Sequence, residues 1–498
     1  MMNDELAFNA LFEKFMNKIF LLFMFFVVCK LPAQQVRRLD LAEVIALAKS
    51  QSIAARQAAT TKETRYWEYR SFKSNYKPQL VLNGNLPSFT RSFREVWQPN
   101  GTVLFQPVRN NNSALSLSLE QNIARTGGTI YATTQLQRFD DFDRRTTLYN
   151  GTPLAAVGLS QPLLRFNALK WDNKIEPLKY DESRQEYIEA LEQIALNASD
   201  FYFDLLLGQV NLKIAETNLK NTADILAIAN EKYELGKTSR NELLQLQLEQ
   251  LKAQKAVASA QRDVAIAALQ LKSFTGIQSA ENLDLSEPRP ENPPSLNPVQ
   301  LLEEAFANRS DAIAFSRRRL ESERAVAKAK GDNGVNATLM ANLGFANSSV
   351  NLGEVLQSPQ NYQSVQLQLG VPILDWGRSK SRIKTAEANR ELTGYAIEQD
   401  KQTFQQEIFT QVTLFDMLKN QLGLTEKADQ IAQEQYQIAQ ERYVLGNLDV
   451  TALSLSFAEK DRAKRDYIGA LRDYWMAYYQ LRRLTLFDFE KGQKLERQ

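Results

Sequence analysis

Residues able to do covalent or metal chemistry are scarce in this sequence. None of its 498 residues is histidine, and cysteine occurs once, as Cys29. A Ser-His-Asp triad, a histidine general base and a zinc site built from histidine or cysteine are therefore excluded, as is an internal disulfide framework. Chemistry based on carboxylates alone stays open, but the sequence contains no identifiable paired-acid cleft. We expect no catalytic residue, no cofactor and no metal site.

One short motif resembles part of a nucleotide site. Gly236-Lys237-Thr238 has the ending of a phosphate-binding loop, yet Glu231 stands where the first glycine of such a loop belongs. Basic and acidic residues are balanced, with 60 Lys and Arg against 58 Asp and Glu, so no strongly positive surface is available for nucleic acid. We therefore expect no nucleotide and no nucleic acid as ligand.

Length and hydropathy narrow the class of protein. A chain of 498 residues has room for two to four domains. With 44% hydrophobic residues and a mean hydropathy of -0.39, it is not a membrane protein built from several apolar helices. A binding protein, a structural protein or a β-type membrane protein remains.

The N-terminus has the pattern of a secretory signal. Residues 19–28 form the one strongly apolar stretch, Lys18 precedes it, and a small residue, Ala33, stands before Gln34. A basic start, a short apolar run and a small residue at the junction are typical of a cleaved signal. We predict a signal segment over residues 1–33, and a buried core helix is the alternative.

Two details refine this prediction. Met16 is the better start, because acidic residues before it do not suit the basic region of a signal. Cys29 invites a lipoprotein interpretation, but Val28 stands where a lipidation motif has a small residue. We expect the thiol to be lost with the signal, which leaves an exported protein without cysteine.

Proline positions divide the chain. Of 15 prolines, none lies between Leu178 and Glu287 or between Ile373 and Gln498, while five lie between Pro288 and Pro298. Such a cluster ends any helix and marks a boundary. The expected organisation is residues 34–276 as a first repeat, 277–298 as a proline-rich linker, 299–490 as a second repeat and 491–498 as a tail.

The two halves share motifs at one spacing, which predicts an internal duplication. The offset is 210 residues in each of three pairs. The pairs are Glu231-Lys232-Tyr233-Glu234-Leu235-Gly236 with Glu441-Arg442-Tyr443-Val444-Leu445-Gly446, Pro162-Leu163-Leu164 with Pro372-Ile373-Leu374, and Ile228-Ala229 with Ile438-Ala439.

Period-two alternation predicts six strands. Val365, Leu367 and Leu369, for example, alternate with Gln366 and Gln368. The predicted strands cover about 78–88, 113–123, 128–138 and 153–163 in the first half, and about 335–346 and 363–373 in the second.

The first half contains an extra hairpin and two polar loops. Strands 113–123 and 128–138 are joined at Thr126-Gly127-Gly128, where glycines suit a tight turn. The polar segments Pro87–Asn112 and Phe139–Thr152 are expected to be external loops.

Long helices surround the strands. Helices are expected over residues 39–76 and 299–330, and much longer ones after the strands, such as Ala168 to Leu235. Apolar residues in the long segments step by 4 and 3, a coiled-coil spacing. About 68 helical residues rise roughly 100 Å at 1.5 Å each, far beyond a globular helix. Each long helix is predicted to fold back at a tip, near residue 236 and near residue 446.

A lipid-facing sheet cannot remain open, because unpaired backbone groups in hydrocarbon cost several kcal/mol each. A closed barrel needs about eight strands. The chain supplies four strands, or six if the hairpin 113–138 joins, so copies must share a barrel, and a homotrimer gives 12 or 18 strands. We prefer the version in which the hairpin joins. A soluble sheet that caps a coiled coil is the alternative.

Over nearly the whole mature chain, this plan resembles the TolC-like outer membrane efflux protein (outer membrane factor) family. The resemblance lies in the duplicated helix–strand–strand–helix–helix order, the Tyr-x-x-Gly turns at Tyr233 and Tyr443, and Pro162 and Pro372 at strand ends. It implies an α+β membrane protein, a homotrimer with an outer-membrane β-barrel continued by a helical coiled-coil barrel through the periplasm. It also implies a passive exit duct for tripartite efflux or type I secretion.

The resemblance further implies partners and sites. The partners are outer-membrane lipid, a periplasmic adaptor and an inner-membrane pump of the resistance-nodulation-division, ABC or major facilitator type. The docking turns would be formed by Leu235, Gly236, Lys237, Leu445, Gly446 and Asn447. A helix stop is the simpler role for both glycines.

Aperture residues carry over less completely. Glu242 occupies the position of the family's first-turn carboxylate, but Leu448 replaces a basic residue, and Ala452 and Leu455 replace aspartates. Asp449 is the nearest carboxylate, as an aperture residue or as a helix cap.

Several aromatic residues lie near the ends of predicted strands. Trp97, Phe105, Phe142 and other aromatics there fit the interfacial belts of a barrel.

Two alternative functions remain. The first is a periplasmic coiled-coil adaptor, which predicts no lipid-facing alternation. The second is an enzyme on a helical scaffold, for which no acid pair is found.

Overall fold

The computed structural model describes residues 36–236, 239–277, 282–290, 294, 296–445 and 447–495. The chain forms two compact units, the first from Met1–Arg56, Gln193–Pro293 and Leu414–Gln480, and the second from Gln57–Glu192, Pro294–Thr413 and Leu481–Gln498. The predicted signal, with Met16, Cys29 and Ala33, lies outside the described residues, so it stays a prediction.

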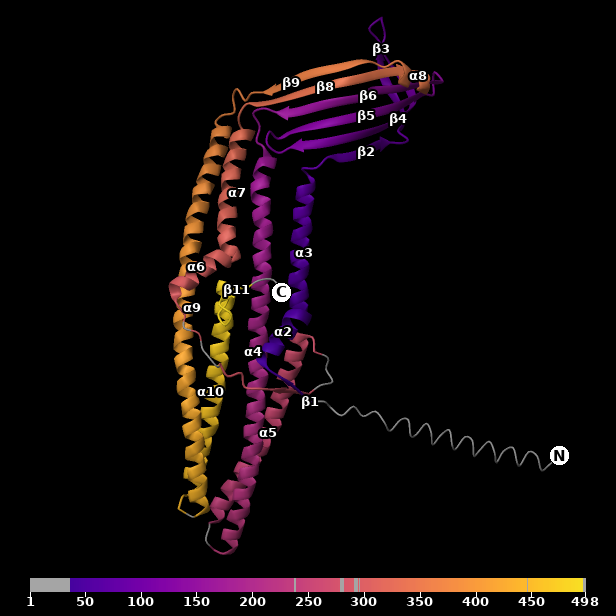
Figure 1. Cartoon of the computed structure of the whole chain (residues 1–498). Helices are drawn as coiled ribbons and strands as arrows, with labels where there is room; N and C mark the ends of the chain where they lie inside the picture. Colours follow the sequence, from indigo (N-terminus) through magenta and orange to yellow (C-terminus); the bar gives the residue numbers. More distant parts are fainter. Residues whose placement is uncertain are drawn as a thin grey trace, which may run out of the picture. The chain divides into compact units, whose positions relative to one another are not determined.

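Helices make up most of the described chain (Figure 1). Their bounds are α2 Leu41–Gln51, α3 Ile53–Ser74, α4 Ala168–Glu234, α5 Arg240–Thr275, α6 Pro298–Asn308, α7 Ser310–Asp332, α8 Leu352–Gln357, α9 Arg378–Val444 and α10 Val450–Thr485. Within the described residues, none of them combines the length and hydropathy that crossing a lipid bilayer requires.

Helix lengths match between the two halves of the sequence. α4 and α9 have 67 residues each, and α5 and α10 have 36 each. The shorter pairs also agree, with 11 residues in α2 and α6, and 22 and 23 residues in α3 and α7.

The two single helices expected over 39–76 and 299–330 are each broken, which corrects that prediction. Ser52 has an extended backbone, and its hydroxyl accepts a hydrogen bond from the Ala55 amide at 3.0 Å. Serine competes for backbone groups in this way and so favours a helix start over a helix interior. At the second break, Arg309 is extended, and the carboxylate of Glu189 on α4 accepts from the Ser310 amide at 2.8 Å. Both breaks therefore come from side-chain caps.

A seven-stranded antiparallel sheet belongs to the second unit. Its strands are β2 Gln79–Asn85, β3 Phe89–Trp97, β4 Val103–Ile123, β5 Gly128–Asp141, β6 Thr146–Pro162, β8 Asn336–Ser349 and β9 Gln360–Gly370. The order is β2-β4-β5-β6-β8-β9, with β3 paired only to the outer part of β4. The hairpin β4–β5 lies inside the sheet, between β2 and β6.

The predictions of two external loops were both wrong in part. Residues 89–97 and 103–111 form a two-stranded ribbon within the segment predicted as a loop from Pro87 to Asn112. The second loop shrinks to residues 142–145, because β5 and β6 pair as far as Asp141 and Thr146. β3 pairs with the part of β4 that follows it directly, and the outer part of β6 pairs with β5, so backbone hydrogen bonds form strands in segments without regular alternation.

The sheet has one apolar and one polar face. Leu117 on β4 stands opposite Leu82 on β2, and Leu343 on β8 stands opposite Val157 on β6. All four side chains are exposed. On the other face, Ser118 and Thr133 share a hydrogen bond of 2.9 Å.

Small strands hold other segments. β1 (Val36–Leu39) pairs in parallel with β7 (Asn282–Leu285), so the segment 277–298 contains a strand in addition to the expected linker. The buried Tyr202 on α4 donates its hydroxyl hydrogen to the Ser286 carbonyl at 2.5 Å and fixes the end of β7. In the expected tail, β11 (Gln493–Lys494) pairs with β10 (Phe487–Asp488).

Candidate functional site: the helix-to-helix turns and the cluster behind them

The first turn joins α4 to α5. Gly236 has a φ of 69°, a left-handed conformation that favours glycine, and its amide donates to the Tyr233 carbonyl at 2.9 Å. Ser239 starts α5 by accepting the Glu242 amide at 3.2 Å. Leu235 is 69% exposed, so the turn presents an apolar side chain to its surroundings. Lys237 lies outside the described residues.

The second turn joins α9 to α10. Leu445 is 74% exposed, close to the exposure of its counterpart Leu235. The Asn447 amide donates to the Arg442 carbonyl at 2.9 Å. Asp449 caps α10, because its Oδ1 accepts the Ala452 amide at 2.7 Å. Gly446 lies outside the described residues.

The two candidate carboxylates have different surroundings. Glu242 is half-buried in the first turn of α5 and lies near Tyr443 of α9. Burial first, and then the charge of Glu242, raise the pKa of the Tyr443 hydroxyl. Asp449 is exposed and is engaged in its cap. Within the described part of the chain, no hydrogen bond or ion pair joins Glu242 to Asp449.

An apolar cluster, which we call the tip cluster, lies directly behind the second turn. Its buried members are Ala439 and Tyr443 of α9 and Leu453 of α10, and it also contacts Ile225, Tyr436 and Leu448. Leu448 therefore packs into this cluster at the position where the resemblance places a basic residue. Leu455, in contrast, is 71% exposed.

Polar contacts join α4 to the second helical hairpin near the tip cluster. Lys232 lies 5.3 Å from the ring centre of Tyr443, and Asn221 donates to the Tyr436 hydroxyl at 3.0 Å. Asn218 donates to the buried Asp461 carboxylate at 2.7 Å. The spacing of Tyr436, Ala439 and Tyr443 predicts a helical seam, but the partners on α4 and α10 come from positions far away in the sequence.

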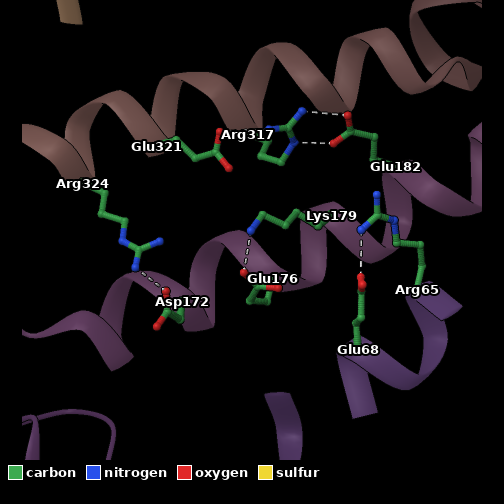
Figure 2. Close-up of polar contacts among 9 residues, drawn as sticks. All are labelled: Arg65, Glu68, Asp172, Glu176, Lys179, Glu182, Arg317, Glu321 and Arg324. Atoms are coloured by element: carbon green, nitrogen blue, oxygen red, sulfur yellow. Dashed lines mark hydrogen bonds and ion pairs between the residues drawn. The ribbon is translucent and has the colours of Figure 1, made fainter. Parts of the chain in front are cut away.

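A second group of charged residues lies among α3, α4 and α7 (Figure 2). Arg317 binds Glu182 through two nitrogens, at 2.5 and 2.9 Å, and Arg324 binds Asp172 at 3.0 Å. Hydrogen bonding to the Glu182 carboxylate raises the pKa of the Arg317 guanidinium above its ordinary value. Arg317–Glu182 and Arg324–Asp172 join α7 to α4, whereas Arg65–Glu68 and Lys179–Glu176 are pairs within a single helix.

Comparisons with known proteins agree with this architecture. The family model for outer membrane efflux protein matches residues 106–277 and 301–485. The probable outer membrane lipoprotein SilC of Salmonella typhimurium is 26% identical over 275 residues, which are 54% of this chain and 58% of SilC. That match therefore spans less than two thirds of SilC.

Solved structures share the fold at low identity. The CmeC outer membrane channel of Campylobacter jejuni superposes with a TM-score of 0.66 at 15% identity, over 92% of this chain and 87% of CmeC. The outer membrane protein VceC of Vibrio cholerae gives a TM-score of 0.62 at 15% identity, over 92% of this chain and 97% of VceC. The family resemblance inferred from the turns and strand ends is thus confirmed. Since the family model matches most of its length, this chain belongs to the outer membrane efflux protein family, whose members are channels and not enzymes.

Proposed function

We propose that this protein is the outer-membrane exit duct of a tripartite efflux or type I secretion system, a passive route for small molecules or peptides. The exposed apolar face of the seven-stranded sheet carries the proposal. Val365, Leu367 and Leu369 on β9 are 78%, 61% and 61% exposed, and Leu80 and Leu82 on β2 are each 67% exposed. So much apolar surface suits lipid and does not suit water.

The sheet closes into a barrel with copies of itself. β2 and β9 form the edges, and each lacks a neighbour on its outer side within the described chain. Lipid does not tolerate such open edges. Six strands per chain, of which β2 has 7 residues and the other five 11 or more, give 18 in a homotrimer, in which β9 of one copy pairs with β2 of the next. The equal lengths of α4 and α9, and of α5 and α10, support two internal repeats in the helical barrel.

The helix-to-helix turns dock a periplasmic adaptor, which links the duct to an inner-membrane pump of the resistance-nodulation-division, ABC or major facilitator type. Leu235 and Leu445 are the anchors, because exposed apolar side chains next to glycine turns suit a helical partner. The backbone amides of Gly236 and Asn447 form hydrogen bonds that shape these turns. Lys237 and Gly446, which lie outside the described residues, are the remaining residues of the proposed docking turns.

Glu242 is the first aperture residue, since its carboxylate lies one turn beyond the first tip. Asp449 is the second, and its cap to Ala452 holds it in place at the start of α10. An aperture with these two carboxylates differs from an acidic ring closed by a salt bridge. Leu448 stands where the basic partner of such a bridge would be, and it packs in the tip cluster.

The signal segment stays part of the proposal. Cleavage after Ala33 removes Cys29, whereas the relative SilC is described as a lipoprotein. The mass of the mature N-terminal peptide distinguishes the two. An N-terminus at Gln34 supports the signal, and a lipid-modified Cys29 overturns it.

The deciding experiment is the mass of the detergent-solubilised protein from fractionated outer membranes, with bound detergent subtracted. A species of three chains that conducts ions in a planar bilayer is expected. A monomer in the soluble periplasmic fraction would overturn the duct and favour the adaptor function.

A further inference from the structure

The β3–β4 ribbon, residues 89–97 and 103–111, extends past the rest of the sheet (Figure 1). β3 pairs with β4 alone. The ribbon lies at the end of the sheet away from α3 (Figure 1). It contains the first residues of β4, which pair with β3, whereas the last residues of β4 lead into the turn before β5. A two-stranded ribbon without cover is marginal in water, which raises the question of what it contacts.

One face of the ribbon, which we call the aromatic face, carries most of its aromatic side chains. Phe89, Phe93 and Trp97 of β3 lie on it and are 60%, 72% and 74% exposed, with Arg91 and Glu95 between them on the same face. Phe105, which is 61% exposed, and Pro107 lie on the same face of β4, opposite Glu95 and Phe93. The other face is formed by Thr90, Ser92, Arg94, Val96, Leu104 and Gln106.

The aromatic face continues the apolar face of the sheet. β4 pairs with β2, β3 and β5 without a register shift, so its odd-numbered residues share one face throughout. Phe105 therefore belongs to the face that carries Leu115, Leu117 and Leu119. A membrane strand needs about 9–11 residues, and residues 110–123 of β4, which pair with β5, already provide them. The ribbon lies beyond that span.

The ribbon is also cationic. Arg91 stands directly opposite Arg109, a like-charge pair that favours an anion nearby. Asp143 neutralises Arg109 through bonds of 2.7 and 2.8 Å. Asp143 also lies within electrostatic reach of Arg91. Within the described chain, neither Arg91 nor Arg94 forms an ion pair, and Glu95 is the ribbon's one acidic residue.

We propose that the aromatic face of the β3–β4 ribbon lies on the phosphate-bearing headgroup layer of the outer leaflet, with Arg91, which shares that face, binding phosphate. Trp and other aromatics concentrate at membrane interfaces, and guanidinium groups bind phosphate strongly. The ribbon then anchors the barrel at its outer rim. This inference rests on the proposed function, because it requires the sheet to span the bilayer.

The test uses the full chain with Cys29→Ser and one new cysteine that carries a fluorescent label. The positions are Phe93→Cys on the aromatic face, Ser92→Cys on the opposite face of the same strand, and Leu367→Cys on the sheet. The vesicles contain phosphatidylcholine alone or mixed with phosphatidylglycerol. Iodide quenches labels in water, and lipids brominated near the headgroup quench labels at the interface.

In mixed vesicles, the label at position 93 is expected to be quenched by the brominated lipid and several-fold less by iodide than the label at 92. Arg91→Gln is expected to reduce this difference toward the value in phosphatidylcholine alone. Equal iodide quenching at 92 and 93, with lipid quenching at 367, would overturn the inference and leave the duct intact. Protection of 93 from both quenchers would also overturn it, because a protein surface then covers the ribbon. Absence of lipid quenching at 367 would instead overturn the proposed function.

Discussion

Arg317 on α7 and Glu182 on α4 form a two-point ion pair between helices 135 residues apart in sequence. The Arg317 Nε and Nη2 atoms donate to the two carboxylate oxygens of Glu182 at 2.5 and 2.9 Å. Glu182 is only 9% exposed, so Arg317 supplies polar contacts that water cannot reach to make. The pair connects a helix of the first half to a helix of the second.

Replacement of Arg317 by glutamine should destabilise this helix contact. The Glu182 carboxylate would be left without its partner in a mostly buried position, at an expected cost of about 1–3 kcal/mol in the free energy of unfolding. The free energy of unfolding of Arg317→Lys should lie between those of the parent and of Arg317→Gln, since an ammonium group cannot make two parallel bonds to the carboxylate. Thermal unfolding in detergent measures both.

The matched control is Arg319→Gln on the same helix. Arg319 is exposed and pairs with Glu323 at 3.4 Å, so its loss should change stability by less than about 0.5 kcal/mol. Equal effects of the two glutamine variants would contradict a special role for Arg317.

Tyr202 predicts a loss of stability at alkaline pH. Burial raises the pKa of its hydroxyl to about 12, from an ordinary value of 10.0. The pKa of Tyr202 is higher in the folded protein than in the unfolded chain. The stability that the neutral Tyr202 hydroxyl gives the folded protein is therefore fully present below pH 10 and is lost as pH rises through 12. The expected loss is about 2–3 kcal/mol.

Tyr202→Phe should lower stability at neutral pH by about 1 kcal/mol, through loss of the bond to Ser286, and should flatten the decline above pH 10. Denaturant unfolding at a series of pH values gives both quantities. Tyr233→Phe, at a more exposed tyrosine on the same helix, is the control. An unchanged alkaline decline in Tyr202→Phe would disprove this assignment.

The docking turns predict a binding defect without a folding defect. The double variant Leu235→Ser, Leu445→Ser removes two exposed side chains, and an anchor contribution of about 1.4 kcal/mol would weaken adaptor binding roughly tenfold. Binding of the purified adaptor to the trimer measures this. The control is Leu269→Ser on α5, where the leucine is 65% exposed but lies away from both turns. This variant should bind the adaptor with the affinity of the parent chain. Full adaptor affinity in the double variant would argue against docking at these turns.

The tip cluster predicts a local stability effect. Tyr443 is buried against Ala439 and Leu453, so Tyr443→Ala should cost about 3 kcal/mol. Hydrogen exchange should then accelerate over residues 436–453. Tyr443→Phe keeps the ring and should exchange nearly as the parent chain does. If alanine leaves exchange unchanged, the cluster does not hold the second turn.

The hairpin within the sheet predicts channel size. Asn112 on β4 stands opposite Phe139 on β5, so residues 113–138 are removable by a direct junction there. β2 then meets β6 in the antiparallel sense, which leaves four strands per copy and 12 in a trimer. Since barrel diameter grows roughly linearly with strand number, conductance should fall to roughly half.

The control removes only the β3–β4 ribbon between Thr90 and Asn110, which extends past the sheet. Its conductance should equal that of the parent. Parent-like conductance after removal of the hairpin would show that β4 and β5 stand outside the barrel wall.

Periodicity by itself determined the long helices and the strands with one apolar face. The 4,3 spacing along residues 194–233 requires a helix with one apolar stripe, and the alternation of Val365, Leu367 and Leu369 requires a strand with one apolar face. Such patterns are local, and a single segment carries them completely. The equal spacing of Tyr233 and Tyr443 from their glycines likewise placed both turns.

The β3–β4 ribbon, the helix breaks and the tip cluster were decided by tertiary structure. Arg91 and Glu95 interrupt the aromatics of β3, so strand character became visible only once β4 supplied hydrogen bonds. The break before Ser310 depends on Glu189, which is 121 residues away. Leu448 and Ile225 meet at the tip cluster although nothing in either segment specifies the other. Local sequence sets which face of an element is apolar, but the partner of that face depends on contacts between distant segments.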